Sequence, residues 1–351
     1  MNPAPLLSVR DLEVGFATEG GLLQAVDGVN FDLRAGEVLA IVGESGSGKS
    51  VTAQTLIGLT RSKNSRIEGS VKLEGEELID ASDATMRRLR GDRIAMIFQD
   101  PMTSFNPVYR LGNQIIEAIR AHKGEKLDKA QARRRVVELF DAVGIPDAER
   151  RIDDYPHEFS GGMRQRAMIA MALALEPEVL IADEPTTALD VTIQAQILHL
   201  LEDLNRERGL ATILITHDLG VVAEVADRVL VMYAGRIVED GTLDEIFYDP
   251  QHPYTWGLMG SLTRLDRPRP HRLPQIAGSP PSLLDLPDGC SFRPRCPHEF
   301  SKCPQLPDLK ARLSEAPDHR DRCWLPAAEK REKRQVEGQI GLEAPAEARR
   351  V

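Results

Sequence analysis

The sequence lacks a long apolar run. No stretch reaches the roughly 18 residues that a membrane helix needs, and the longest candidates, such as residues 229–234, have the length of a strand. Residues 1–9 show neither a basic flank nor a long apolar region, so no signal peptide is expected. We therefore expect the chain to be made and kept in the cytoplasm.

The chain also lacks a surplus of positive charge. Its 54 acidic residues outnumber 44 basic ones and give a net charge of -10. That balance argues against a protein dominated by contacts to nucleic-acid phosphates and favours a simple role in solubility. With 351 residues, 42% of them hydrophobic and 28% charged, the composition is that of a globular chain long enough for two domains.

Cysteine is scarce, and all four cysteines fall in one segment: Cys290, Cys296, Cys303 and Cys323. Disulfides are not expected in a reducing cytoplasm, so the grouping favours metal ligands. Proline follows Cys296 and Cys303, as in ferredoxin runs, and no C-x-x-C zinc knuckle is present. Four thiolates suit a [4Fe-4S] cluster or Zn²⁺, and unligated thiols are the third interpretation. A metal here would mainly stabilise a proline-rich segment with few core residues.

A glycine-rich loop carries the strongest chemical signal. It follows an apolar run at 38–42, which predicts a buried strand, and precedes a predicted helix that begins at Val51. Its spacing, G-x-x-x-x-G-K-S, brings backbone N–H groups to phosphate oxygens at a helix N-terminus. Lys49 can reach the β- and γ-phosphates, and the Ser50 hydroxyl can ligate Mg²⁺. The loop consists of Gly43, Glu44, Ser45, Gly46, Ser47, Gly48, Lys49 and Ser50.

Polar residues follow three further predicted strands. Asp183 and Glu184 end the apolar run 179–182, where adjacent carboxylates are costly without a cation. Asp183 is suited to the hydration shell of Mg²⁺ and Glu184 to polarising an attacking water. Gln99 ends a strand at 93–98 and can coordinate Mg²⁺, although alone it would be an ordinary surface residue. His217 ends a strand at 211–216, where a hydrogen bond to a γ-phosphate competes with a structural role.

Two other features have both a functional and a plain interpretation. Ser160, Gly161 and Gly162 precede a helix that is predicted to run to residue 175; Ser160 fits an N-cap, and the glycines expose N–H groups to an anion. Phe16 lies just past the first of two predicted antiparallel strands in 7–34, where it either stacks on an adenine ring or packs in a loop. Residues 100–156 have helical periodicity and are typical of a helical insertion in an α/β core.

Together these residues resemble the nucleotide-binding subunit of an ATP-binding-cassette (ABC) transporter. The resemblance implies an α/β P-loop NTPase fold with an antiparallel β subdomain, a helical subdomain at about 100–170 and a small metal-binding C-terminal extension. In its terms Phe16 is the adenine contact, residues 43–50 are Walker A, Ser160 to Gly162 are the signature, and Asp183 with Glu184 ends Walker B. Asp190 closes a further loop that begins at Ala188, and His217 is the switch histidine. Phe159 and Met163 depart from the commonest signature, but an active site is still expected.

The last third of the chain resembles the extension of oligopeptide and dipeptide importer ATPases, through residues 252–255, 276–281 and 289–297. The resemblance favours the [4Fe-4S] cluster over Zn²⁺. It implies domains at 1–260 and 261–327, with a charged flexible tail at 328–351. It also implies an ATP- and Mg²⁺-dependent enzyme on the cytoplasmic face of the inner membrane.

By the same resemblance, the signature of one subunit covers the triphosphate held by another, so a second ATPase subunit is needed, usually a different chain. Two transmembrane permease subunits and an extracytoplasmic solute-binding protein complete the implied importer, and no nucleic acid takes part. Peptides are the leading cargo, with nickel chelates, glutathione and related solutes as alternatives. A non-transport ABC ATPase and a regulatory subunit with an inactive site are the other classes. The first usually has two cassettes or a long coiled coil, and the intact Lys49 and Glu184 argue against the second.

Overall fold

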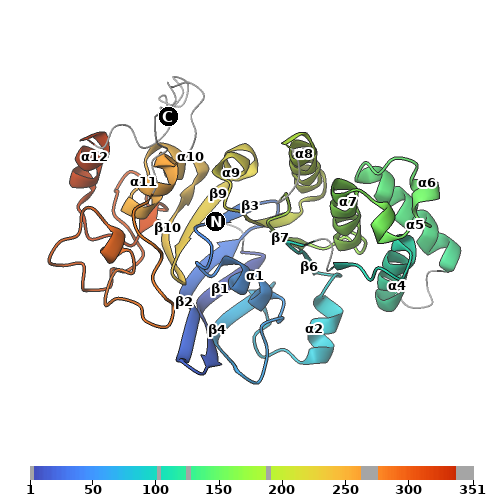
Figure 1. Ribbon diagram of the computed structural model, residues 1–351, viewed down its shortest axis with the longest axis horizontal. Helices are drawn as coiled ribbons and strands as arrows, with labels where there is room; N and C mark the ends of the chain where they lie inside the picture. The colour runs from blue at the N-terminus through green and yellow to red at the C-terminus, as the bar shows by residue number, and fades with distance from the viewer. Residues whose placement is uncertain (1–3, 101–103, 124–127, 187–190, 262–275, 337–351) are drawn as a thin grey trace. The chain divides into compact units, whose positions relative to one another are not determined.

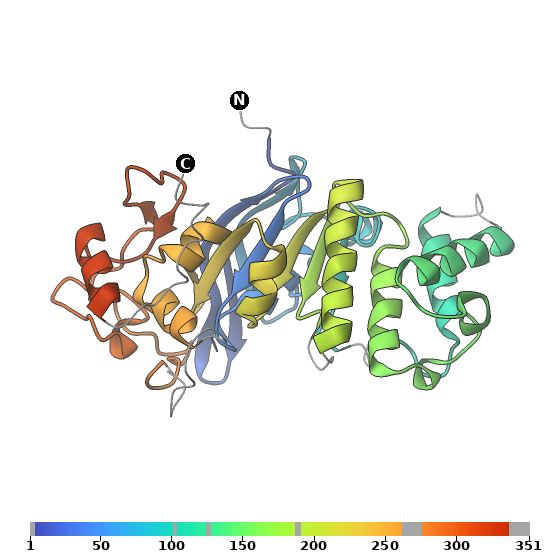
Figure 2. The ribbon, with the colours of Figure 1, turned by 90° about the horizontal axis from the view of Figure 1, so that it is seen from above.

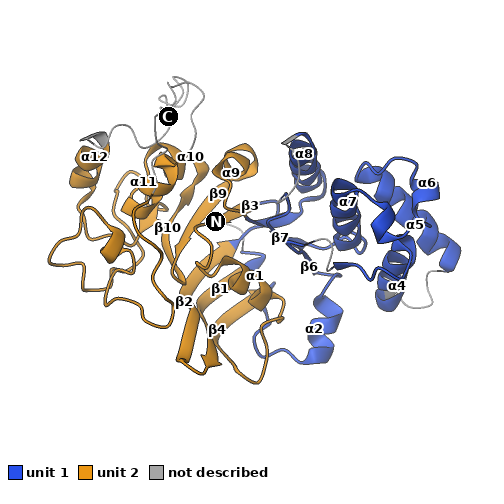
Figure 3. Cartoon of the chain, in the orientation of Figure 1, with its two compact units in different colours: residues 1–7, 33–38, 73–215 blue, residues 8–32, 39–72, 216–351 orange. Residues whose placement is uncertain are grey.

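The chain divides into two compact units, each assembled from separated pieces of sequence (Figure 3). The computed structural model describes residues 4–100, 104–123, 128–186, 191–261 and 276–336. Unit 1 comprises residues 1–7, 33–38 and 73–215, and unit 2 comprises residues 8–32, 39–72 and 216–351. Within the described residues, no helix is both long and apolar enough to cross a membrane.

Three parallel strands form the core of unit 1. They are β6 (Ile94–Ile97), β7 (Val179–Asp183) and β8 (Ala211–Ile215), and every residue in them is buried. β7 pairs with β6 on one side and with β8 on the other. Strands that are buried on both faces need continuous apolar sequence, which explains why these runs do not alternate. Parallel pairing also brings the carboxyl ends of all three strands to one edge.

Helices make up the rest of unit 1 (Figure 1). Helices α4, α5 and α7 pack on one another. The helical periodicity predicted within residues 100–156 is confirmed in α4, where Leu111, Ile115 and Ile119 share a face and are all buried. Helices α7 and α8 run side by side (Figure 2). The helices are α2 (Asp83–Leu89), α4 (Leu111–Lys123), α5 (Lys129–Ala142), α6 (Ala148–Arg151), α7 (Gly161–Ala172) and α8 (Val191–Arg208), with a short 3-10 turn η2 (Pro156–Glu158).

In unit 2 the long N-terminal strands form a sheet in which β1 lies between β2 and β4. Its alternating burial changes phase at Asp11, which has a positive φ of 46°: Leu7 and Val9 are buried before it, and Leu12 and Val14 after it. An extra residue of this kind is the mark of a β-bulge, which restores the apolar face beyond the irregularity. The strands are β1 (Leu7–Thr18), β2 (Gly21–Leu33) and β4 (Ser65–Leu73), and the short β5 (Glu76–Glu77) belongs to unit 1.

The other strands of unit 2 surround β9 (Arg228–Tyr233). It pairs in parallel with β3 (Val38–Val42) and antiparallel with β10 (Arg236–Thr242). β10 pairs in turn with β12 (Arg320–Asp321), and β12 with β11 (Lys310–Ala311), so the far C-terminal segment joins this sheet. The helical elements are α1 (Lys49–Leu56), α9 (Leu219–Val225), α10 (Leu243–Tyr248), α11 (Pro253–Gly260), the 3-10 turn η3 (Arg293–Arg295) and α12 (Ala327–Val336).

Two features differ from what the sequence predicts. Residues 327–336 form helix α12 instead of a frayed tail, because Lys330 turns inward to a buried ion pair with Asp321 at 2.7 Å; residues 337–351 lie outside the described part. Phe16 lies inside β1, half-buried, and not beyond it, because the strand continues to Thr18. Helix ends also differ by a few residues: α1 begins at Lys49, and α7 ends at Ala172.

Candidate nucleotide-binding site

The glycine-rich loop joins β3 to α1 in unit 2, as predicted. Gly43 and Gly48 have positive φ values of 151° and 103°, and a Cβ on either would strike backbone oxygen. It would lie 2.1 Å from Met232 O at Gly43 and 2.4 Å from Ala25 O at Gly48. The loop therefore adopts its path only with glycine at these two positions.

The Lys49 ammonium lies inside the loop. It donates to the carbonyl oxygens of Gly43 at 2.7 Å and Glu44 at 3.0 Å, and the side chain is buried. Ser50 and Val51 follow in the first turn of α1 and are half-buried. Gly46, which has open space where a Cβ would be, and Ser45 are the more exposed part of the loop. The ammonium is thus held where an anion that enters the loop would meet it.

Contacts from the C-terminal segment hold the loop in place, and sequence reasoning missed them. The amide of Glu44 donates to the Tyr254 hydroxyl at 2.8 Å. The Glu44 carboxylate accepts two hydrogen bonds from Arg295, at 2.6 and 3.0 Å. Gly235 donates its amide to Ser47 O at 2.9 Å. The stretches around Tyr254 and Arg295 stand out in the sequence, but nothing local shows that they reach residue 44.

His217 and Phe16 belong to unit 2 as well. The amide of Thr216 donates to Ile41 O at 3.4 Å, which brings the segment before His217 to the strand that leads into the loop. His217 itself is exposed, and the next residue, Asp218, caps α9 by accepting from the Gly220 amide. Phe16 is half-buried in β1. Both the stacking and the packing interpretation of Phe16 therefore stay open.

Gln99, Asp183 and Glu184 meet at the carboxyl edge of the unit 1 strands. Gln99 Nε2 donates to Glu184 Oε2 at 2.8 Å, as strand ends on one edge predict. Asp183 ends β7 and is buried. Glu184 has a positive φ of 49°, held by a hydrogen bond from its amide to Ile215 O at 2.8 Å. Left-handed backbone in a residue other than glycine is costly, and such strain clusters at functional sites.

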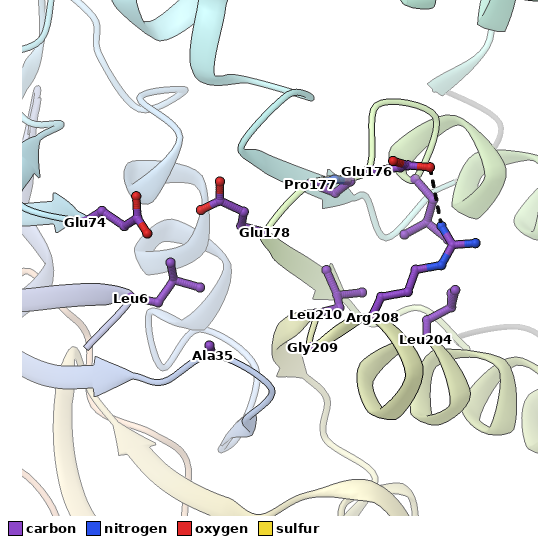
Figure 4. A pocket seen from close by; sticks show the side chains of 11 residues that line it. Leu6, Ala35, Glu74, Glu176, Pro177, Glu178, Leu204, Arg208, Gly209 and Leu210 are labelled. Atoms are coloured by element: carbon purple, nitrogen blue, oxygen red, sulfur yellow. Dashed lines mark ion pairs between the residues drawn. The ribbon is translucent and has the colours of Figure 1, made fainter. Parts of the chain in front are cut away.

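The opposite end of β7 faces a different feature, a hollow of about 560 Å³ (Figure 4). Glu74 and Glu178 point toward each other there, and Arg93 forms ion pairs with both, at 2.7 and 2.5 Å. Arg208 pairs more loosely with Glu176, at 3.9 Å. These carboxylates already form ion pairs with arginines, and they lie at the amino end of β7, away from Asp183. The hollow is therefore not the candidate site.

The signature residues open helix α7. Ser160 is its N-cap, as predicted, and accepts a hydrogen bond from the Met163 amide at 3.3 Å. Both Ser160 and Gly161 are exposed. A Cβ on Gly161 would meet open space, whereas one on Gly162 would lie 3.1 Å from Ile193. The first turn of α7 thus offers N–H groups to solvent and to any anion brought against it. Asp190 lies outside the described residues.

The four cysteines gather in unit 2. All are free and half-buried, and they line one small cavity together with His252, Phe292, His298 and Trp324. Burial raises the pKa of Cys296 and of Cys323 to about 12 each and also raises that of Cys290. Buried thiols of this kind become thiolates only if a nearby cation stabilises the negative charge.

The same cysteines do not form a ready site for a single ion. In the described part of the chain, no three or more His, Cys, Asp or Glu side chains are placed so as to hold one. Four thiol side chains on one cavity are the donor type that both an iron–sulfur cluster and Zn²⁺ use.

Comparison with known proteins identifies two regions of the chain. Residues 26–187 match the ABC transporter family, and residues 238–303 match the oligopeptide/dipeptide transporter C-terminal region. The oligopeptide transport ATP-binding protein OppD of Salmonella typhimurium is 55% identical over 306 residues, which cover 87% of this chain and 90% of that protein. The dipeptide transport ATP-binding protein DppD of Bacillus subtilis is 52% identical over 321 residues, covering 91% and 94%.

Solved structures agree with this result. The dimeric ABC transporter cassette MJ0796 superimposes with a TM-score of 0.62 at 26% identity, covering 68% of this chain and 98% of that one. CbiO1 from Clostridium perfringens, part of an ABC transporter complex, gives a TM-score of 0.57 at 30% identity, covering 70% and 91%. The fold is thus the ABC cassette. The chain belongs to the ABC transporter family, in the branch whose ATP-binding proteins carry the oligopeptide/dipeptide transporter C-terminal region.

Proposed function

We propose that this chain is the ATP-hydrolysing subunit of an importer for di- or oligopeptides. The observation that carries the proposal is the hydrogen bond between Gln99 and Glu184, next to the buried Asp183. The same chain has a glycine loop in which the Lys49 ammonium is hydrogen-bonded to the loop backbone. The names of the relatives, OppD and DppD, supply the cargo class. Import of nickel chelates, glutathione or other solutes is the alternative within this branch.

In this proposal the phosphate loop binds the triphosphate through its backbone N–H groups and Lys49, and Phe16 contacts the adenine. Mg²⁺ would be held by Ser50, Gln99 and Asp183 and would neutralise β- and γ-phosphate oxygens. Glu184 orients or deprotonates the attacking water, which Gln99 helps to place. His217 donates to the γ-phosphate. Phosphoryl transfer of this kind depends on position and charge, so no covalent intermediate with the protein is needed.

A second ATPase subunit completes each site. Each motif occurs once in the chain, and Ser160, Gly161 and Gly162 would cover the triphosphate of the partner. Asp190 is proposed as a further nucleotide-binding residue. The exposed first turn of α7 supports this role. We further propose two transmembrane permease subunits and an extracytoplasmic solute-binding protein as partners, with the chain bound peripherally to the cytoplasmic face of the inner membrane.

The four cysteines are proposed to bind a [4Fe-4S] cluster that stabilises the C-terminal extension. Their shared cavity supports it. Cluster chemistry would supply four sulfur–iron bonds and no step of ATP hydrolysis. Purified anaerobically, the chain should contain about four irons and four acid-labile sulfides, and Cys303→Ser should lower both. A full complement of zinc with no iron would contradict the cluster.

We propose domain boundaries at 1–260 for the cassette, with its helical part at about 100–170, and at 261–327 for the extension. Helix α12 belongs with the extension, because its Lys330 forms a buried ion pair with Asp321. We therefore extend that domain to residue 336.

The decisive experiment is ATP hydrolysis by the assembled transporter. Glu184→Gln should abolish turnover, by about 10²-fold or more, while leaving ATP bound in a closed dimer. Glu202→Gln, an exposed carboxylate on α8, is the matched control and should behave as the wild type. Uptake of labelled dipeptides, longer peptides and nickel by the same complex identifies the cargo. Wild-type turnover by Glu184→Gln would remove Glu184 from its proposed role.

A further inference from the structure

One arginine of the C-terminal extension forms an ion pair with the phosphate loop. Arg295 donates through Nη1 to Glu44 Oε2 at 2.6 Å and through Nη2 to Glu44 Oε1 at 3.0 Å, a two-pronged ion pair across 251 positions of sequence. Its side chain is only 5% exposed, against 27% for Glu44. Such fork-to-fork pairs fix orientation as well as charge.

The remaining donors of Arg295 are occupied too. Nε donates to Ala277 O at 2.9 Å, Nη2 to Ile276 O at 3.4 Å, and Nη1 to the Tyr233 hydroxyl at 3.3 Å. The guanidinium also lies over the rings of Tyr233 and Phe292, 5.8 and 6.0 Å from their centroids. A buried and fully bonded guanidinium keeps one position, unlike the long side chains of exposed ion pairs.

Residue 44 is held at three points. Arg295 forms an ion pair with its carboxylate, Tyr254 accepts a hydrogen bond from its amide, and Lys49 donates one to its carbonyl oxygen. Two of these three groups belong to the C-terminal third of the chain. Since the third is the lysine that meets the phosphates, the conformation of Glu44 also sets where that ammonium lies.

Charge makes this arrangement consequential. Glu44 puts a carboxylate into a loop that must accept a polyanion, and like charges at close range weaken binding. We propose that Arg295 is a positioning residue of the nucleotide site: it neutralises Glu44 and fixes the loop so that ATP phosphates can enter. The inference rests on the proposed function, because it assumes that the loop binds ATP.

The same arginine connects the loop to the cysteines. Arg295 ends the turn η3, which lies between Cys290 and Cys296: the Arg293 amide donates to Cys290 O at 3.0 Å, and the Cys296 amide donates to Arg293 O at 3.1 Å. Both cysteines pack against the apolar cluster that contains Tyr233, Tyr254 and Phe292. The backbone around the cysteines therefore determines where the guanidinium points.

Nucleotide affinity of the full-length chain tests the proposal. We expect Arg295→Met to weaken ATP binding about tenfold, ADP less, and adenosine hardly at all, because the repulsion grows with phosphate charge. Adding Glu44→Gln should restore ATP affinity to within about threefold of the wild type, because the carboxylate that Arg295 neutralises is then absent. Arg293→Met is the matched control: it changes the same turn but removes a half-exposed pair with Glu299, and ATP affinity should not change.

The possible results separate the explanations. An equal loss for ATP and adenosine, or no rescue by Glu44→Gln, would show that Arg295 only supports the fold and would overturn the proposal. Unchanged ATP affinity in Arg295→Met would overturn it as well. If that variant fails to fold, Arg295→Lys carries the test, with a loss of about threefold that Glu44→Gln again removes. A wild-type chain that binds no ATP would instead refute the proposed function.

Discussion

The buried ion pair between Lys330 and Asp321 gives the sharpest stability prediction. The two side chains are each 1% exposed, and Nζ lies 2.7 Å from Oδ1. The same oxygen accepts from the Cys323 amide at 2.9 Å, and Asp321 belongs to β12, which pairs with β10. One contact therefore joins helix α12, a cysteine-bearing segment and the edge of a sheet.

Lys330→Met leaves a buried carboxylate without its main partner. Arg312, whose Nε lies 3.4 Å from the same oxygen, compensates only in part. Breaking a buried pair from one side costs about 3–5 kcal/mol, which corresponds to a rise of roughly 10² to 10⁴ in the population of the locally opened segment. Replacing both partners, in Asp321→Leu with Lys330→Met, should cost less than about 2 kcal/mol, because no charge is then stranded.

Hydrogen exchange of amides in residues 320–330 measures this opening directly. Lys333→Met, on a more exposed part of α12, is the matched control and should leave exchange nearly unchanged. The reasoning is refuted if Lys330→Met changes exchange less than about tenfold, or if the costs of the two single changes simply add in the double variant.

Two other predictions follow from local geometry. Gly48→Ala should cost about 1–3 kcal/mol in urea unfolding and abolish ATP binding, because its Cβ would lie 2.4 Å from Ala25 O. Gly28→Ala, which also has a positive φ but whose Cβ meets nothing within 4 Å and which lies outside the loop, should keep ATP binding, and equal losses in both would contradict the steric argument. Burial disfavours the charged ring of His319, but the hydrogen bond and charge of Glu239 outweigh it and raise the His319 pKa above its usual 6.5. The stabilisation that the protonated His319 ring contributes is complete below pH 6.5 and is lost as the pH rises through the folded-state pKa. Urea midpoints should therefore fall more between pH 6 and 9 in the wild type than in His319→Gln. Parallel curves would exclude this pair as the cause.

The parts of the site that could be predicted are those whose signal is local. The strand at 38–42 ends where five consecutive apolar residues end, and Gly43 and Gly48 are needed because backbone oxygen fills the space of a side chain. Gln99 and Glu184 meet because parallel strands share an edge. Ser160 caps α7 through its own hydroxyl. In each case the chemistry and the geometry lie within a few residues of each other.

What could not be predicted depends on distant partners. The sequence around Lys330 is highly charged and indicates a solvated tail, yet one lysine finds a buried carboxylate nine residues earlier. The alternating pattern predicts a strand that ends before Phe16, whereas β1 continues to Thr18. Arg295 was part of a family resemblance, but its contact with Glu44 spans 251 positions. Periodicity and spacing carry no information about such pairs.

The contacts to Glu44 bear on how the cassette and its extension work together. Tyr254 and Arg295 both lie within residues 238–303, the stretch that matches the transporter C-terminal region, and outside residues 26–187, which match the ABC family. Other residues restrict the glycines of the loop, because a Cβ on Gly43 would strike Met232 O and one on Gly48 would strike Ala25 O, and both of these residues lie outside the matched C-terminal region. The C-terminal region adds contacts that fix the orientation of the Glu44 carboxylate and neutralise its charge. Damage to the extension should therefore weaken phosphate binding before it disturbs the path of the loop.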